Sequence, residues 1–167
     1  KTLQKEGKVR YFGLSNISEE NLEELLPYKN LFVNCQHEYS LACRIHEAKL
    51  LREVEKLNVT PLTWGSLGQG ILTGKYDINT VFGPDDRRSR EIYVNFHGEK
   101  LKKNLEIVEK MKPIAENHNT TISAVAIRFI LDNIKDSVVI AGVKTRGEML
   151  SNLEALDWHL TEEELKI

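Results

Sequence analysis

The sequence is short of cysteine, of surplus charge and of long apolar runs. Two cysteines, Cys35 and Cys43, are too few for a disulfide framework, and the five scattered histidines lack metal-ligand spacing. The net charge of −2 shows that the chain has no excess of basic residues, which nucleic-acid-binding proteins need. No apolar run approaches the ~20 residues that cross a bilayer, and no secretory signal pattern is present. These absences predict a cytoplasmic protein that has no metal site and binds neither nucleic acid nor membranes.

The chain also lacks an initiator methionine. It begins at Lys1 within a polar, helix-compatible run and ends at Ile167, partway into an expected helix. Its 167 residues, of which 41% are hydrophobic, suffice for one globular domain with a sizeable core. We therefore expect residues 1–167 to form a single partial domain that is incomplete at both ends.

Short apolar segments alternate with amphipathic segments along the whole chain. Apolar and β-branched residues predict four strands, at 9–14, 31–35, 58–63 and 137–141. Apolar residues at helical spacing predict helices at 18–26, 47–57, 100–117, 123–133 and 148–156. Ser18 is suited to cap the first of these, and Thr161 with Glu164 matches a capping box that opens a last helix. This order is typical of parallel strands joined by right-handed crossovers in an α/β fold.

The run from Trp64 to Tyr76 follows the third expected strand and carries four glycines within ten residues. Glycine allows the backbone to adopt positive φ and to approach a ligand without a Cβ in the way. A large aromatic plane beside exposed N–H groups suits a flat heterocycle that carries phosphates. A surface loop whose Trp64 covers the core fits the same composition about equally well, because such loops are common.

Each expected strand is followed by a polar or glycine-rich turn. These turns are at 15–16, at Gln36, at 64–70 and at 144–145. Each one alone is an ordinary turn, but the carboxyl ends of parallel strands meet at one edge, where α/β proteins bind ligands. The four turns together favour a site. The mixed-charge stretch 77–98 is expected to be an exposed loop that is either functional or mobile.

Several of these segments occur in a specific order along the chain: Gly13 to Asn16, Gln36 to Leu41, Leu67 to Tyr76, Asp85 to Arg88, Gly142 to Thr145 and Asn152 to Leu156. Together they resemble the aldo-keto reductase family, most closely its bacterial and potassium-channel β-subunit-like branch. The resemblance covers essentially the whole chain. It implies an α/β fold that is the C-terminal half of a (β/α)8 TIM barrel, with four parallel strands, numbers five to eight, and flanking helices.

The resemblance also implies a site for a nicotinamide dinucleotide, NADP(H) or NAD(H). Ser15, Asn16 and Gln36 would bind the carboxamide, and Trp64 would stack on the nicotinamide ring. The pyrophosphate would meet backbone N–H groups of the glycine-rich loop, and the adenosine end would lie near 144–152. The implied residues are Ser15, Asn16, Gln36, Trp64, Gly65, Ser66, Leu67, Gly68, Gly70, Lys75, Gly142, Lys144, Thr145, Glu148 and Asn152.

Preference between the two cofactors stays open. Glu148 would repel a 2′-phosphate and accept hydrogen bonds from free ribose hydroxyls, whereas Lys144 and Arg146 offer positive charge nearby. Ser151 stands where the family usually has a glutamate that contacts adenine.

The function implied for the parent protein is NAD(P)H-dependent reduction of aldehydes or ketones to alcohols by hydride transfer. The family's catalytic Asp, Tyr, Lys and His lie in its first half, and no counterpart occurs here. The sequence therefore offers no catalytic residue, and the chain alone is expected to be inactive. A non-catalytic, dinucleotide-binding regulatory module is the alternative. The expected partners are a small carbonyl substrate of the parent and either a second copy of the chain or an N-terminal half.

Overall fold

A computed structural model describes residues 2–47, 51 and 55–167 and contains one four-stranded parallel sheet. The strands are β1 (Phe12–Ser15), β2 (Phe32–Glu38), β3 (Thr60–Trp64) and β4 (Val138–Val139), in that spatial order. All three pairings are parallel, as the sequence pattern predicts. The predicted strand boundaries are wrong in several places, since β1 begins at Phe12 and β3 at Thr60 rather than at residues 9 and 58. β4 is shorter than the segment 137–141, and β2 continues past Cys35, so Gln36 lies inside a strand rather than in a turn.

Alternating side chains give the sheet two different faces. On β2, Cys35 and His37 are buried, whereas the intervening Gln36 and Glu38 are partly exposed. Cys35 packs with Leu22 of the neighbouring helix, so the buried face is the helix-covered one. The opposite face carries the partly exposed Gln36, Glu38 and Trp64, because Gln36 pairs with Ser15 and Glu38 with Trp64 in the register. This polar face is the one that a ligand can reach.

The helices are α1 (Thr2–Lys5), α2 (Glu19–Leu25), α4 (Gly98–Asn117), α5 (Ile122–Asn133) and α6 (Arg146–Leu153). Three begin with side-chain caps: Ser18, Thr121 and Thr145 accept hydrogen bonds from backbone N–H groups three residues on. The predicted cap at Ser18 is thereby confirmed. Most of the helix predicted at 47–57 lies outside the described residues. In the part of this segment that is described, Leu51 is buried and Glu55–Leu57 forms a 3₁₀ helix.

The helix predicted from Thr161 is only a single 3₁₀ turn, Glu164–Lys166. Its capping box is nevertheless present, because Thr161 Oγ1 accepts from the Glu164 N–H and the Glu164 carboxylate accepts from the Thr161 N–H. His118 Nε2 lies 3.0 Å from the same carboxylate, and its ring stacks on Trp158 at 4.3 Å. These contacts hold the C-terminal segment against the end of α4.

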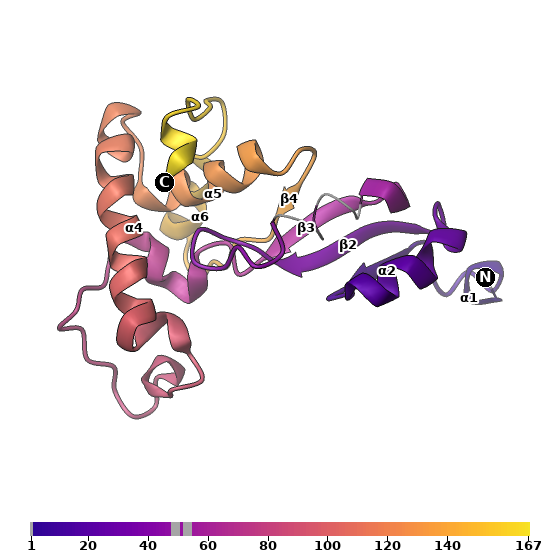
Figure 1. Cartoon of the computed structure of the whole chain (residues 1–167), viewed down its shortest axis with the longest axis horizontal. Coiled ribbons are helices and arrows are strands. Elements are labelled where there is room, and N and C mark those ends of the chain that lie inside the picture. The colour runs from indigo at the N-terminus through magenta and orange to yellow at the C-terminus, as the bar shows by residue number, and fades with distance from the viewer. Residues whose placement is uncertain (1, 48–50, 52–54) are drawn as a thin grey trace.

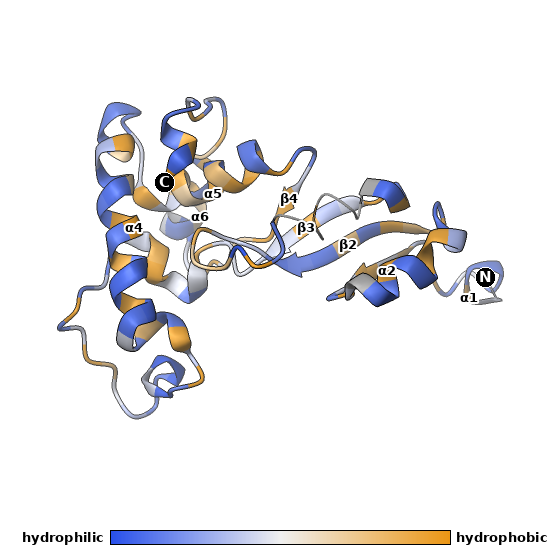
Figure 2. Cartoon of the chain, in the orientation of Figure 1, coloured by the Kyte–Doolittle hydropathy of each residue, from blue (hydrophilic) through white to orange (hydrophobic). Residues whose placement is uncertain are grey.

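The main hydrophobic core lies between α4, α5 and the segment that follows β3. Met111, Phe129 and Ile130 are fully buried there together with Ile71 and Leu72. Figure 1 shows α4, α5 and α6 gathered at one end of the molecule, while β1, β2 and β3 extend away with α2 beside them. In Figure 2, α4 alternates between hydrophilic and hydrophobic residues along its length and α5 is mostly hydrophobic. No helix among the described residues is long and apolar enough to cross a membrane.

Candidate functional site

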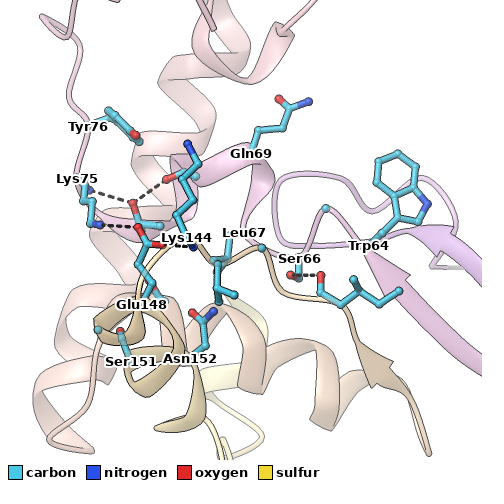
Figure 3. Close-up of a pocket in the computed structure, with 18 of the residues that line it drawn as sticks. Trp64, Ser66, Leu67, Gln69, Lys75, Tyr76, Lys144, Glu148, Ser151 and Asn152 are labelled. Carbon is cyan, nitrogen blue, oxygen red and sulfur yellow. Dashed lines mark hydrogen bonds and ion pairs between the residues drawn. The ribbon is translucent and has the colours of Figure 1, made fainter. Parts of the chain in front are cut away.

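A cavity of about 700 Å³ opens where β3 and β4 end. Most of the predicted site residues line it: Trp64, Gly65, Ser66, Leu67, Gly70, Lys75, Gly142, Lys144, Glu148 and Asn152. In Figure 3, Trp64 lies on one side of the cavity and Lys75 with Glu148 on the other, near Ser151 and Asn152 of α6. The ends of β3 and β4 therefore form one hollow with an aromatic side and a charged side.

The loop after β3 follows a backbone path that glycine makes possible. Gly65, Gly68, Gly70 and Gly74 all have positive φ. A Cβ at Gly68 would lie 2.9 Å from Ile71 Cγ2 and 3.0 Å from the Cβ of Ala42, closer than real side chains approach. Gly68 therefore packs under the loop and does not line the cavity. It holds the loop against the core so that its neighbours face the hollow.

Trp64 is fixed by contacts with the ends of the two preceding strands. Its Nε1 donates to Asn16 Oδ1 at 3.4 Å, and its carbonyl oxygen accepts from the Tyr39 N–H at 3.1 Å. Asn16 has φ of 51° and donates its own N–H to the carbonyl oxygen of Gln36 at 2.8 Å. Asn16 and Gln36, with Ser15 beside them, thus lie at the same edge as Trp64 but outside the lining of the cavity.

A capping box forms the wall at the start of α6. Thr145 Oγ1 accepts from the Glu148 N–H at 3.2 Å, and Glu148 Oε2 accepts from the N–H groups of Lys144 at 2.7 Å and Thr145 at 3.3 Å. The hydrogen bond from the Lys144 N–H, then that from Thr145, lowers the pKa of the Glu148 carboxyl. Thr145 is therefore a cap that shapes the wall, and it is not part of the lining.

Positive charge gathers around this wall. Lys75, Lys144 and Arg88 line the cavity, and Lys75 Nζ lies 3.9 Å from Glu148 Oε1. Glu148 is the only carboxylate among the lining residues that the structure describes, so cations outnumber anions there. A cavity with this balance suits an anionic ligand.

Arg88 anchors the long loop that precedes α4. Its guanidinium donates to the Asp86 carboxylate and the Tyr76 hydroxyl, and it lies 4.7 Å from the Phe82 ring centroid and 5.8 Å from that of Phe96. The hydrogen bonds that the Arg88 side chain and then its backbone N–H donate to Asp86 lower the pKa of that carboxyl to about 2. The prediction that residues 77–98 form an exposed loop is wrong in part, because Asn95 and Phe96 are buried.

Several lining residues were not among the predicted ones: Gln69, Thr73, Tyr76, Arg88, Ser123, Ile140, Val143, Gly147 and Ser151. Three of them lie within the glycine-rich run itself, so its spacing was a usable signal for them. Ser123 carries no such signal, because only the packing of α5 against the loop after β3 brings it to the cavity. No group of three His, Cys, Asp or Glu residues within the described ranges is arranged to hold a metal ion.

Comparison with known proteins gives consistent matches. The model of the Aldo/keto reductase family matches residues 1–167. An aldo-keto reductase from Strobilurus tenacellus is 35% identical over 166 residues, which are 98% of this chain and 48% of that protein. The NADH-specific methylglyoxal reductase of Escherichia coli (strain K12) is 26% identical over 160 residues, 96% of this chain and 48% of that protein.

Two further matches concern a channel subunit and a solved structure. A probable voltage-gated potassium channel subunit beta from Oryza sativa subsp. japonica is 29% identical over 158 residues, 90% of this chain and 48% of that protein. The structure of a glycerol dehydrogenase from Gluconobacter oxydans matches with a TM-score of 0.86 at 30% identity, over 99% of this chain and 49% of that one. The chain thus spans about half the length of the curated relatives it matches.

Proposed function

The chain belongs to the aldo/keto reductase family, and from this premise we propose that it carries the nicotinamide-dinucleotide site of a carbonyl reductase. The observation that carries the proposal is the cavity at the ends of β3 and β4. One cavity holds an aromatic plane, Trp64, and a cationic rim formed by Lys75 and Lys144. That pairing matches the flat ring and the phosphates of a dinucleotide.

The residues present fit such a ligand. Aromatic side chains bind flat rings face to face, and the Asn16 contact sets the plane of the Trp64 indole. Gly65, Gln69 and Gly70 line the cavity with positive φ, and a glycine lets the backbone approach a ligand without a Cβ in the way. Asn152 of α6 lies within reach of the same cavity. We accordingly assign the nicotinamide to Trp64, the pyrophosphate to 67–70 and the adenosine to the α6 wall.

The proposed reaction divides into a part done here and a part done elsewhere. A bound dihydronicotinamide would supply the hydride for an aldehyde or ketone carbon. Trp64, with Ser15, Asn16 and Gln36 at the neighbouring strand ends, would orient the ring and select the face that is presented. The acid that protonates the carbonyl oxygen would come from outside these 167 residues, where we also place most of the substrate pocket.

We further assign the four strands to positions five to eight of a (β/α)8 barrel. In the part of the chain that the structure describes, β1 and β4 each pair on one side only. Val138 and Ile140 on the polar-face side are 49% and 41% exposed, and α6 exposes Met149, Leu150 and Leu153 to similar degrees. Apolar surface of this extent fits coverage by another half-barrel.

A regulatory module that binds the dinucleotide without turnover is the second candidate. The match to the potassium channel subunit beta favours it. Assays of the full-length protein with NADH, NADPH and a panel of small aldehydes and ketones separate the two candidates. Steady turnover supports the reductase, whereas tight binding without turnover supports the module.

Trp64→Ala is expected to weaken dinucleotide binding by roughly 1 kcal/mol or more, because the stacking surface for the ring is lost. Titration of the wild type and the variant with NADH and NADPH, followed calorimetrically, measures the difference. Trp158→Ala is a matched control, since Trp158 stacks on His118 away from the cavity. Equal affinities of wild type and Trp64→Ala would contradict the assignment of the ring to Trp64.

Glu148→Gln is expected to raise the affinity for NADPH relative to NADH about tenfold, because a negative charge near the 2′-phosphate is removed. Glutamine retains the capping box that Glu148 forms with Thr145, so the start of α6 stays intact. Competition titrations of both proteins with the two cofactors give the ratio. A wild type that already prefers NADPH strongly, with the ratio unchanged in the variant, would refute this role.

A further inference from the structure

Three side-chain amides form a continuous chain from the core to the cavity. Asn104 of α4 and Asn95 of the preceding 3₁₀ helix are buried, with 0% and 5% of their surface exposed. Asn104 Nδ2 donates to the backbone oxygen of Asn95 at 3.1 Å and to Asn95 Oδ1 at 3.2 Å. Asn95 Nδ2 in turn donates to Gln69 Oε1 at 3.3 Å, and Gln69 lines the cavity.

One backbone carbonyl determines how all three amides are oriented. The Asn95 carbonyl oxygen only accepts, so Asn104 must turn its NH₂ group towards it. The second hydrogen of that NH₂ group then requires an acceptor on Asn95, which places the Asn95 NH₂ group towards Gln69. Gln69 must therefore accept with Oε1, and its Nε2 is left free. Among residues 2–47, 51 and 55–167, Gln69 Nε2 donates no hydrogen bond.

The arrangement is costly, which argues that it serves more than packing. Asn104 Oδ1 is buried without a hydrogen-bond partner among the described residues, and such a group costs free energy. Gln69 adopts φ of 61°, a left-handed conformation that is uncommon for a side-chain-bearing residue. The first feature lies at the core end of the amide chain, and the second lies where the chain reaches a cavity with cations on its rim.

We infer that Gln69 Nε2 donates a hydrogen bond to a phosphate oxygen of the bound dinucleotide, and that Asn95 and Asn104 are positioning residues that orient it. Gln69 lies between Gly68 and Gly70, where the pyrophosphate is assigned, and Lys75 adds positive charge nearby. An amide held with its NH₂ group outward stabilises an anion, whereas its oxygen would repel one. This inference rests on the proposed function.

The test compares dissociation constants of the full-length protein for NADH, NADPH and ADP-ribose at pH 8. Gln69→Met keeps the length of the side chain and removes the donor, so all three constants should rise about tenfold, as for a hydrogen bond to a charged group. Asn95→Asp offers Gln69 an acceptor and reverses the Gln69 amide, so it should weaken binding at least as much. Asn79→Asp adds the same charge at an exposed position of the same loop and should leave binding unchanged.

The double variant Gln69→Met with Asn95→Asp separates positioning from general damage. If Asn95 acts through Gln69, the double variant binds like Gln69→Met alone. An equal loss from Asn95→Asp in both backgrounds would show a structural role and overturn the positioning claim. If circular dichroism shows that the Asn95→Asp variant is unfolded, Asn95→Ala replaces it in the same comparison with Gln69→Met.

The dissociation constants of the Gln69→Met variant and of the wild type distinguish failure of the inference from failure of the proposed function. Unchanged constants in a protein that binds dinucleotides would overturn the inference and leave the proposed function standing. A loss with NADH and NADPH but not with ADP-ribose would place the contact away from the pyrophosphate and also overturn it. A wild type that binds none of the three ligands would overturn the proposed function and the inference together.

Discussion

Replacing Gly68 with valine is expected to weaken dinucleotide binding by roughly 30-fold or more, which corresponds to about 2 kcal/mol. Gly68 has φ of 54°, which costs an L-residue roughly 1–2 kcal/mol and a β-branched one more. Its Cβ would also overlap Ile71 and Ala42, and overpacking of this kind costs roughly 1–3 kcal/mol. The loop would leave its conformation to relieve both costs, and the arrangement of Leu67, Gln69 and Gly70 along the cavity would be lost.

Gly83→Val is the matched control for this substitution. Gly83 lies in the loop before α4, where a Cβ meets no atom within 4 Å, and its φ is outside the left-handed range. Titration calorimetry with NADH gives the affinities, and circular dichroism confirms that each variant is folded. A folded Gly68→Val protein with wild-type affinity would show that the loop conformation does not matter for binding.

Between pH 7.5 and pH 4, the free energy of unfolding of the wild type should fall by about 3 kcal/mol more than that of a His37→Gln variant. Burial lowers the pKa of His37 from its ordinary 6.5 to about 4, and the neighbouring His46, 5.2 Å away between ring centroids, adds to this. The unfolded chain therefore binds a proton that the folded protein resists. The stabilising contribution of neutral His37 is complete above pH 6.5 and declines as the pH falls towards 4.

Urea unfolding at several pH values measures this dependence. Cys35 Sγ lies 3.2 Å from His37 Nε2, and burial raises the pKa of that thiol to about 11, so it does not titrate in this range. All other residues are the same in both proteins, so the difference between the two curves reports on His37. Parallel stability curves for wild type and variant would contradict the buried, neutral state of His37.

The sequence predicts the order of elements well because the strands and helices are strongly periodic. The strand that ends on Trp64 and the helices α4 and α5 follow directly from local patterns of apolar residues. β4 differs, because its registered pairs with β3 are limited to Val138 and Val139, and pairing is a property of two strands. Local composition cannot show where such a ladder ends.

The candidate site likewise contains residues that the sequence predicts and residues that only the packing of the fold brings together. Trp64, Leu67 and Lys75 stand in one short run, and their common location in the cavity follows from the resemblance. The amide chain joins Gln69, Asn95 and Asn104, which are separated by up to 35 positions and share no local pattern. Ser15 and Gln36 reach the same edge of the sheet without lining the cavity, because that cavity lies at β3 and β4. Only the packing of distant segments decides these points.

A crystal structure of the full-length protein grown with NADH or NADPH tests the central claim most directly. The account predicts the nicotinamide ring against Trp64, the pyrophosphate at residues 67–70 within reach of Gln69, and the adenosine beside Asn152. A dinucleotide bound at another place, with the cavity between Trp64 and α6 filled only by water, would contradict the account.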